Sequence, residues 1–179
     1  MKKYFFLLMS IFTLSCCNKD DDSNASLPPA TQTGAGTFAC YVNGEAFIDT
    51  SGGWFNCFYQ YVDGEYYFSI SGDDEDYKYT SSPWSINLGT IKKTISEGEI
   101  LILNEIVEGN AGAVVGFSIS SSNYQISETS NDFTGELTIT KLDFTNHIVS
   151  GTFWFDVQHP VTGERIEIRE GRFDTLFTE

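Results

Sequence analysis

Carboxylates are the most abundant side chains in this sequence that could do chemistry. The 179 residues include 25 aspartates and glutamates against 10 lysines and arginines, for a formal net charge of -15. Two carboxyl groups at a suitable separation could hydrolyse a glycosidic bond. Among so many acids some pair meets that condition by chance, so the sequence selects no catalytic residue. A glycan hydrolase is therefore the alternative hypothesis, and we expect no enzyme.

A dense group of acids occurs in the segment Ser71 to Asp76, SGDDED. Oxygen ligands from Asp73, Asp74 and Asp76 could hold Ca²⁺, which prefers carboxylates and carbonyls. The spacing matches no EF-hand loop, and a solvated loop is the better interpretation. These three aspartates are weak calcium candidates, and we expect no metal and no cofactor.

The histidines and the known catalytic motifs give no further candidate for a functional site. His147 and His159 fall in predicted turns, where a lone histidine is usually a surface residue rather than a base or a ligand. The sequence contains no nucleophile elbow, phosphate-binding loop or dinucleotide fingerprint. Its acidity repels phosphate backbones and its few basic residues form no patch, so we expect no nucleic-acid partner.

Aromatic rings are the remaining candidates for a binding site. Trp54, Tyr67 and Trp154 lie on the faces of predicted strands opposite the apolar positions. Flat rings beside hydrogen-bonding side chains suit sugars, although a single such ring more often belongs to the core or its cover. The first hypothesis is a non-catalytic binding or structural module for a glycan or a protein. A carrier of a small apolar ligand, which requires a closed barrel, is a further alternative.

Cys40 and Cys57 are the two cysteines of the predicted folded part. In an exported protein they could oxidise to a disulfide. Alternatively they are buried small hydrophobes, a role that a free cysteine fills well. The sequence leaves both open, because it does not determine how the strands that carry them pair.

The N-terminus predicts export and a lipid anchor. Two lysines precede an apolar run from Tyr4 to Leu14, which is too short to span a bilayer and is typical of a signal peptide over residues 1–15. Leu14-Ser15-Cys16 resembles a bacterial lipobox, whose cysteine is acylated; Cys17 is the alternative. Acyl chains bury many methylenes, so they would hold the chain on outer-membrane lipid without a transmembrane element.

The segment after these cysteines predicts a tether. Asn18 to Ser23, NKDDDS, resembles the acidic export signal that sends Bacteroidota lipoproteins to the outer face of the outer membrane. The same run could also be only a charged, solvated spacer. We expect residues 16–35 to comprise the lipidated cysteine, this sorting run and a flexible linker, because the segment has little to bury. The predicted location is the outer membrane, exposed on the cell surface.

The strands that would position the candidate residues are clearest in Gly135 to Asp174, which predicts a three-stranded antiparallel meander. Leu137 and Ile139, then Val149 to Val157, then Ile166 and Ile168 alternate with polar residues, as expected of a sheet with one buried face. Continuing that alternation would turn Phe173 outward. We therefore expect a bulge near Gly171 that returns Phe173 to the core.

The first half of the domain predicts hairpins. Asn43-Gly44 and Asp63-Gly64 are two-residue turn signals, and the second pairs Tyr61 with Tyr66 on a core face. Residues 91–97 predict one helical turn between strands. About ten short strands in residues 36–179 predict a single all-β domain, an antiparallel β-sandwich, with a closed β-barrel as the alternative.

A family resemblance rests on four segments. These are residues 27–47 (LPPATQTG followed by VNG), Gly135 to Asp143 (GELTITKLD), Val149 to Phe153 (VSGTF) and Gly171 to Asp174 (GRFD). Together they resemble a family of Bacteroidota lipoproteins known only as a domain of unknown function. The resemblance implies a secreted all-β lipoprotein and assigns no catalytic residue.

Overall fold

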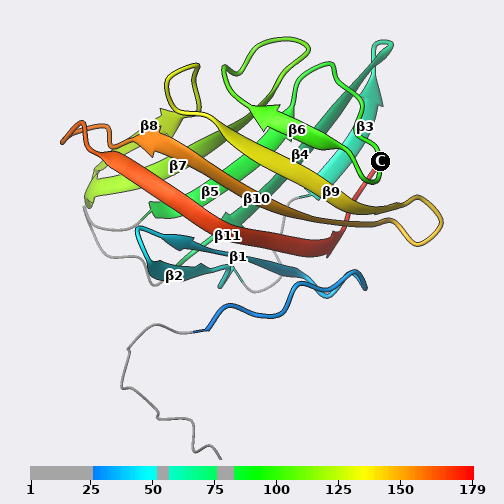
Figure 1. Cartoon of the computed structure of the whole chain (residues 1–179), viewed down its shortest axis with the longest axis horizontal. Helices are drawn as coiled ribbons and strands as arrows, with labels where there is room; N and C mark the ends of the chain where they lie inside the picture. The colour runs from blue at the N-terminus through cyan, green and yellow to red at the C-terminus, as the bar shows by residue number, and fades with distance from the viewer. Residues whose placement is uncertain (1–25, 52–56, 76–82) are drawn as a thin grey trace, which may run out of the picture.

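The described part of the chain folds into eleven β-strands. The structure is a computed structural model and describes residues 26–51, 57–75 and 83–179. The strands are β1 (Thr37–Val42), β2 (Glu45–Ile48), β3 (Cys57–Val62), β4 (Glu65–Asp73), β5 (Pro83–Thr90), β6 (Ile100–Leu103), β7 (Ala111–Ser120), β8 (Asn123–Glu128), β9 (Gly135–Asp143), β10 (Ile148–Gln158) and β11 (Arg165–Leu176). The predicted all-β fold is confirmed (Figure 1).

All strands belong to one mixed sheet with the order β2-β1-β11-β10-β9-β6-β7-β5-β4-β3, and β8 pairs with β7. The sheet changes layer at β6, whose only pairing with β7 is a parallel bridge between Leu103 and Ala111. The strands from β1 to β9 then face those from β7 to β3 across one core, as in a β-sandwich (Figure 1). An isolated bridge joins Phe58 of β3 to Thr178, and the sheet is not closed into a barrel.

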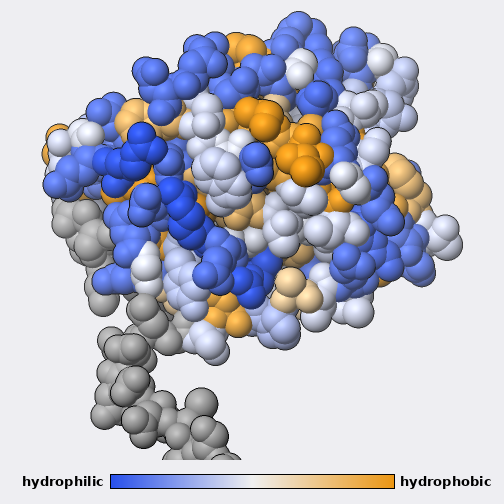
Figure 2. All heavy atoms as spheres, viewed as in Figure 1, coloured by the Kyte–Doolittle hydropathy of each residue, from blue (hydrophilic) through white to orange (hydrophobic). Residues whose placement is uncertain are grey.

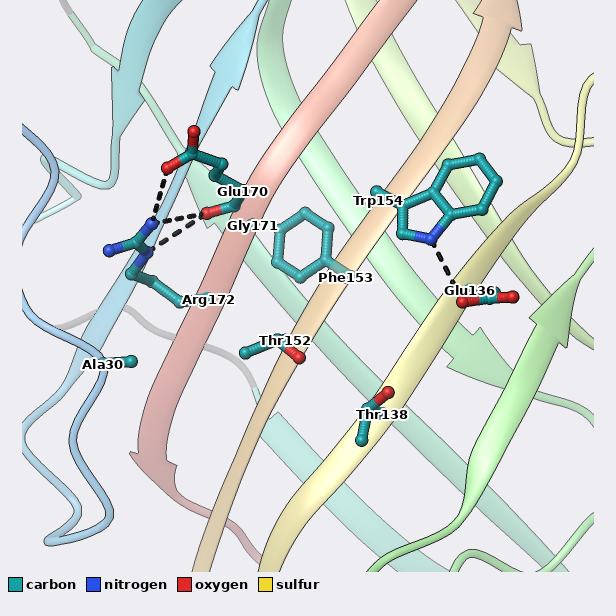
Figure 3. Close-up of a pocket in the computed structure, with 9 residues that line it drawn as sticks. All are labelled: Ala30, Glu136, Thr138, Thr152, Phe153, Trp154, Glu170, Gly171 and Arg172. Atoms are coloured by element: carbon teal, nitrogen blue, oxygen red, sulfur yellow. Dashed lines mark hydrogen bonds and ion pairs between the residues drawn. The ribbon is translucent and has the colours of Figure 1, made fainter.

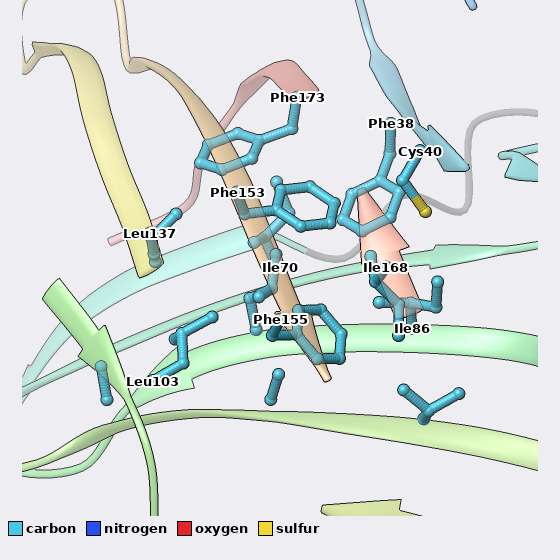
Figure 4. Close-up of a cluster of buried hydrophobic side chains, with 14 of the residues drawn as sticks. Phe38, Cys40, Ile70, Ile86, Leu103, Leu137, Phe153, Phe155, Ile168 and Phe173 are labelled. Atoms are coloured by element: carbon cyan, nitrogen blue, oxygen red, sulfur yellow. The ribbon is translucent and has the colours of Figure 1, made fainter. Parts of the chain in front are cut away.

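The C-terminal meander is present as predicted. β10 pairs antiparallel with both β9 and β11. The residues predicted to face inward are all buried: Leu137, Ile139, Val149, Phe153, Phe155, Val157, Ile166 and Ile168. They pack against residues of the opposite layer such as Ile70 and Ile86 (Figure 4). The period of two therefore identified one whole wall of the core.

The predicted bulge is also present. Phe153 pairs with Gly171, but Phe155 pairs with Ile168, so β11 has one residue more than β10 between these pairs. The extra residue restores Phe173 to the core, where it is buried.

The glycine at the bulge has a different role from the one expected. The left-handed backbone conformation belongs to Glu170, with φ of 51°. A Cβ on Gly171 would lie 2.3 Å from the ring of Phe153, so the glycine is required for the close approach of that ring.

Both predicted hairpin turns are found, with positive φ at both residues of Asn43-Gly44 and of Asp63-Gly64. The register of the second hairpin is as predicted, with Tyr61 opposite Tyr66. Its core face is shorter than expected, because Tyr61 is 63% exposed. Alternation along the strands places Tyr61 and Tyr66 on the inward face. Among the described residues, however, the opposite layer does not cover this end of the hairpin.

The predicted helical turn at residues 91–97 is wrong. This segment is an irregular loop in which Ile95 is buried. The backbone N–H of Lys93 donates to the carbonyl of Tyr66 at 2.9 Å, and that of Ile95 donates to the Tyr59 hydroxyl at 3.3 Å. Because strand residues accept these hydrogen bonds, the loop needs no helical hydrogen bonding.

The last part of the predicted tether lies against the domain. We call residues 26–36 the strap. The side chain of Asp174 on β11 is fully buried and accepts hydrogen bonds from Thr31, Thr33, Gly34 and Ala35 of the strap. Part of the segment expected to be a flexible linker is therefore held by hydrogen bonds to a buried carboxylate.

Candidate functional site

The outer face of the meander carries an open groove of about 390 Å³. Its lining comes from the strap and from three adjacent strands: Ala30, Glu136, Thr138, Thr152, Phe153, Trp154, Glu170, Gly171 and Arg172. We call this the outer groove. In Figure 3 the strap and Arg172 form one side, Trp154 and Glu136 the other, and two threonines lie between them. The outer groove is a concave surface with one exposed aromatic ring, that of Trp154, among polar groups.

Trp154 of β10 is the exposed ring of the outer groove, with 38% of its surface accessible. Its indole N–H donates to a carboxylate oxygen of Glu136 at 3.2 Å. The guanidinium carbon of Arg169 lies 5.6 Å from the ring centroid, in a cation–π contact. Trp154 is thus oriented by two neighbours before any ligand binds.

The arginine over Trp154 is itself held in place. Arg169 lies 2.7 Å from a carboxylate oxygen of Asp156 and 2.9 Å from Glu167. Asp156 is buried and also pairs with Arg165. This network of charges fixes the guanidinium, which a single exposed ion pair would do only weakly.

Two glutamates lie on opposite sides of the outer groove. Glu136 accepts the indole hydrogen bond of Trp154, and Glu170 lies 3.4 Å from the guanidinium of Arg172. Both carboxylates are therefore engaged by neighbouring side chains of the protein. They are the only acids that line this groove among the described residues.

An exposed apolar pair extends the outer groove. Ile100 and Ile102 on β6 point outward, with 60% and 54% of their surfaces accessible. They are the cross-strand partners of Thr138 and Glu136 on β9. Figure 2 shows hydrophobic residues gathered on this face, next to paler residues of the neighbouring strands. The groove and the isoleucine pair form one continuous surface.

The two aromatic candidates that the structure describes, Tyr67 and Trp154, do not come together. Tyr67 points outward from β4 in the other layer and lines a separate groove of about 260 Å³ with Phe58, Asn87 and Ile106. No charged residue lines that second groove among the described residues. Trp54 lies outside the described residues. Of the two predicted rings that are described, Trp154 lines the outer groove and Tyr67 does not.

Several groove residues were not predicted. Glu136, Thr138 and Thr152 occupy outward positions of the meander around Trp154, so the alternation that located the core could also have located them. Arg172 follows from the same alternation once the predicted bulge is included. Ala30 had no such signal, because only the docking of the strap brings residue 30 to β11.

Both cysteines of the domain are buried free thiols. Cys40 lies on β1 and Cys57 on β3. Burial raises the pKa of each thiol well above its ordinary value, which disfavours the reactive thiolate. In this structure they act as small core residues.

The calcium and histidine candidates show no ligand geometry. Within the described residues no group of three His, Cys, Asp or Glu side chains could hold a metal ion. Asp73 continues strand β4, Asp74 follows it, and Asp76 lies outside the described residues. His159 is buried rather than a surface residue, and its ring packs against Phe117. Its Nδ1 accepts the backbone N–H of Val161 and of Thr162, both at 3.2 Å.

The lipidation candidates Cys16 and Cys17 and the acidic run lie outside the described residues. In the part of the chain that is described, no helix is long and apolar enough to cross a membrane. Comparisons with protein families, with curated proteins and with solved structures gave no match for this chain.

Proposed function

We propose that this protein is a surface-anchored outer-membrane lipoprotein whose β domain binds a neutral glycan through the outer groove, without catalysis. The observation that carries the proposal is Trp154, an exposed and pre-oriented ring in a groove lined by hydroxyl, carboxylate and guanidinium groups. The C–H face of a sugar ring packs on an indole, and its hydroxyls can pair with the polar groups beside it.

The orientation of Trp154 supports binding. Arg169 and Glu136 hold the indole, so little side-chain freedom is lost when a ligand packs on it.

The charge of the site supports a neutral ligand. Two glutamates and one arginine line the groove in a chain of net charge -15, which disfavours sulfated or uronic-acid sugars.

The carboxylates of the outer groove support binding more than hydrolysis. A glycosidase needs one carboxyl group that protonates the leaving oxygen and a second that acts as nucleophile or base. Glu136 and Glu170 are each hydrogen-bonded or ion-paired to a partner side chain, the indole of Trp154 and the guanidinium of Arg172.

The lipid anchor is proposed on the basis of the lipobox-like Leu14-Ser15-Cys16 and the acidic run after it.

A protein partner is the second candidate, because Ile100 and Ile102 extend the groove as an exposed apolar pair. Buried apolar side chains dominate protein interfaces, whereas sugars need mainly the ring and the polar groups. Paired Ile100→Ser and Ile102→Ser substitutions should therefore weaken a protein complex but leave glycan binding unchanged.

The test is binding of the full chain to neutral hexasaccharides of glucose, mannose and xylose, measured by calorimetry. Trp154→Ala should weaken binding of the tightest-binding hexasaccharide at least about tenfold, because loss of an aromatic anchor typically removes about 2 kcal/mol of binding free energy. Tyr124→Ala, an exposed aromatic of β8 outside the groove, is the matched control and should bind normally. Equal binding by the two variants would refute the proposal.

A further inference from the structure

Most of the hydrogen bonds between the strap and the domain converge on the carboxylate of Asp174, while the side chain of Gln32 donates separately to the carbonyl of Thr140 at 3.1 Å. Oδ2 of Asp174 accepts the Thr31 hydroxyl at 2.6 Å, the backbone N–H of Thr33 at 2.8 Å and that of Ala35 at 3.2 Å. Oδ1 accepts the N–H of Gly34 at 2.8 Å and the hydroxyl of Ser150 at 2.8 Å. Successive backbone N–H groups that converge on one anion form a nest, here closed around a side chain of the same protein.

The strap sequence suits this arrangement. Gly34 and Gly36 have φ of 75° and 70°, which lets the chain curl around the carboxylate. Pro28-Pro29 precedes it, and prolines restrict the free chain, so less conformational entropy is lost when the strap docks. Docking is thus built into the sequence of residues 28–36.

The docked strap shapes the outer groove in two ways. Ala30 lines one side of it directly. The carbonyl of Pro28 accepts a hydrogen bond from the Arg172 guanidinium at 3.3 Å, while the backbone carbonyl of Glu170 accepts two more from Arg172, at 3.1 and 3.0 Å. Arg172 is therefore fixed between the strap and the bulge, with its side chain in the groove (Figure 3).

We infer that the strap is a structural wall of the ligand groove and that Asp174 is the positioning residue that holds it there. This inference rests on the proposed function of the outer groove. Asp174 and Gly34 do not line the groove, so each acts on a ligand only through the strap. Release of the strap removes Ala30 from the wall and frees the guanidinium of Arg172 from one of its anchors.

The experiment uses two variants that release the strap by independent routes. Asp174→Asn replaces an acceptor of several donors by an amide that can accept fewer of them. Gly34→Val places a β-branched residue at a positive φ, and its Cβ would lie 2.8 Å from Leu176. Asp49→Asn is the matched control, because Asp49 accepts hydrogen bonds from Ser51 and from the backbone of Asp73 elsewhere in the fold.

Hydrogen exchange of the full chain reports whether the strap is released. In both variants the amides of residues 33–35 should exchange at least about tenfold faster than in the wild type, while β9 and β10 stay protected. Affinity for the neutral hexasaccharide that the wild type binds best should fall about five- to twentyfold, because the wall and Arg172 must be ordered again on binding. Asp49→Asn should change neither quantity.

The outcomes separate the inference from the proposed function. Unchanged exchange at residues 33–35, or a released strap with unchanged hexasaccharide affinity, would overturn the role of the strap while Trp154→Ala still tests the groove. A wild type that binds none of the hexasaccharides would overturn both. Even if Asp174→Asn fails to fold, as monitored by thermal unfolding, Gly34→Val decides the inference.

Discussion

Asp174 is the residue whose environment departs most from that of an ordinary surface acid. Burial by itself raises the pKa of a carboxyl group. Here the hydrogen bonds from the strap and from Ser150 outweigh burial and hold the pKa of Asp174 well below its usual range. All these donors are neutral, so the charge is stabilised by oriented dipoles rather than by a cation. A group of this kind ties the stability of the domain to pH.

Asp174 should make the stability of the domain sensitive to acid. The folded pKa of Asp174 lies below the unfolded value of about 3.9, so its contribution is fully present above about pH 5 and is lost as the pH falls toward the folded pKa. Asp174→Asn should therefore lower the free energy of unfolding by about 2–3 kcal/mol at pH 7. That difference should shrink steadily below about pH 4.

Urea unfolding of wild type and variant between pH 3 and pH 7 measures this difference. Asp132→Asn, at an exposed loop position, is the control and should change the free energy by less than about 0.5 kcal/mol at every pH. A difference between wild type and Asp174→Asn that stays constant down to pH 3 would show that the carboxylate is not the group that matters.

The meander is the element on which both the core and the groove depend. One face of β10 supplies Phe153 and Phe155 to the core, and the opposite face supplies Thr152 and Trp154 to the outer groove. Because side chains alternate along a strand, a single register places both sets. The bulge at Glu170 shifts the register of β11 by one residue, which places Phe173 on the core face.

Neighbouring substitutions in β10 test this division. Phe153→Ala should lower the free energy of unfolding by about 3–5 kcal/mol, because it removes a buried ring that contacts Phe38 and Phe173. Thr152→Ala should change it by less than about 0.5 kcal/mol, because Thr152 is exposed. Chemical denaturation gives both values, and similar values for the two variants would contradict the assignment of faces.

At the scale of the whole molecule, a strongly acidic domain continues into an N-terminus that predicts an acyl anchor. The net charge of -15 for the whole chain favours solubility and repulsion from anionic surfaces. The strap leads from the groove face toward residue 26 and the predicted anchor. One continuous segment would therefore connect the groove to the predicted membrane anchor.

Metabolic labelling with a fatty acid tests the anchor. Labelling should disappear in Cys16→Ser and persist in Cys17→Ser, because Ser15 supplies the small residue that precedes a lipidated cysteine. The two adjacent substitutions control for each other. Labelling that survives Cys16→Ser and vanishes with Cys17→Ser would assign the anchor to Cys17. Absence of labelling from the wild type and both variants would contradict the predicted anchor.

Local signals in the sequence determined most of the fold. Alternation along 135–174 identified the buried face, Asn-Gly and Asp-Gly identified two hairpins, and the phase of Phe173 required a bulge. Each of these depends on residues close together in the chain, whose backbone geometry restricts the outcome. The same alternation placed Trp154 on the outer face.

Tertiary structure alone decided the rest. Docking of the strap depends on Asp174, about 140 residues away in the chain, and no local pattern reports such a pairing. The exposure of Tyr61 depends on where the opposite layer ends, and the burial of His159 depends on its packing against Phe117 of β7. Tyr67 and Trp154 were separated because their strands belong to different layers, a consequence of strand order, which long-range pairing sets.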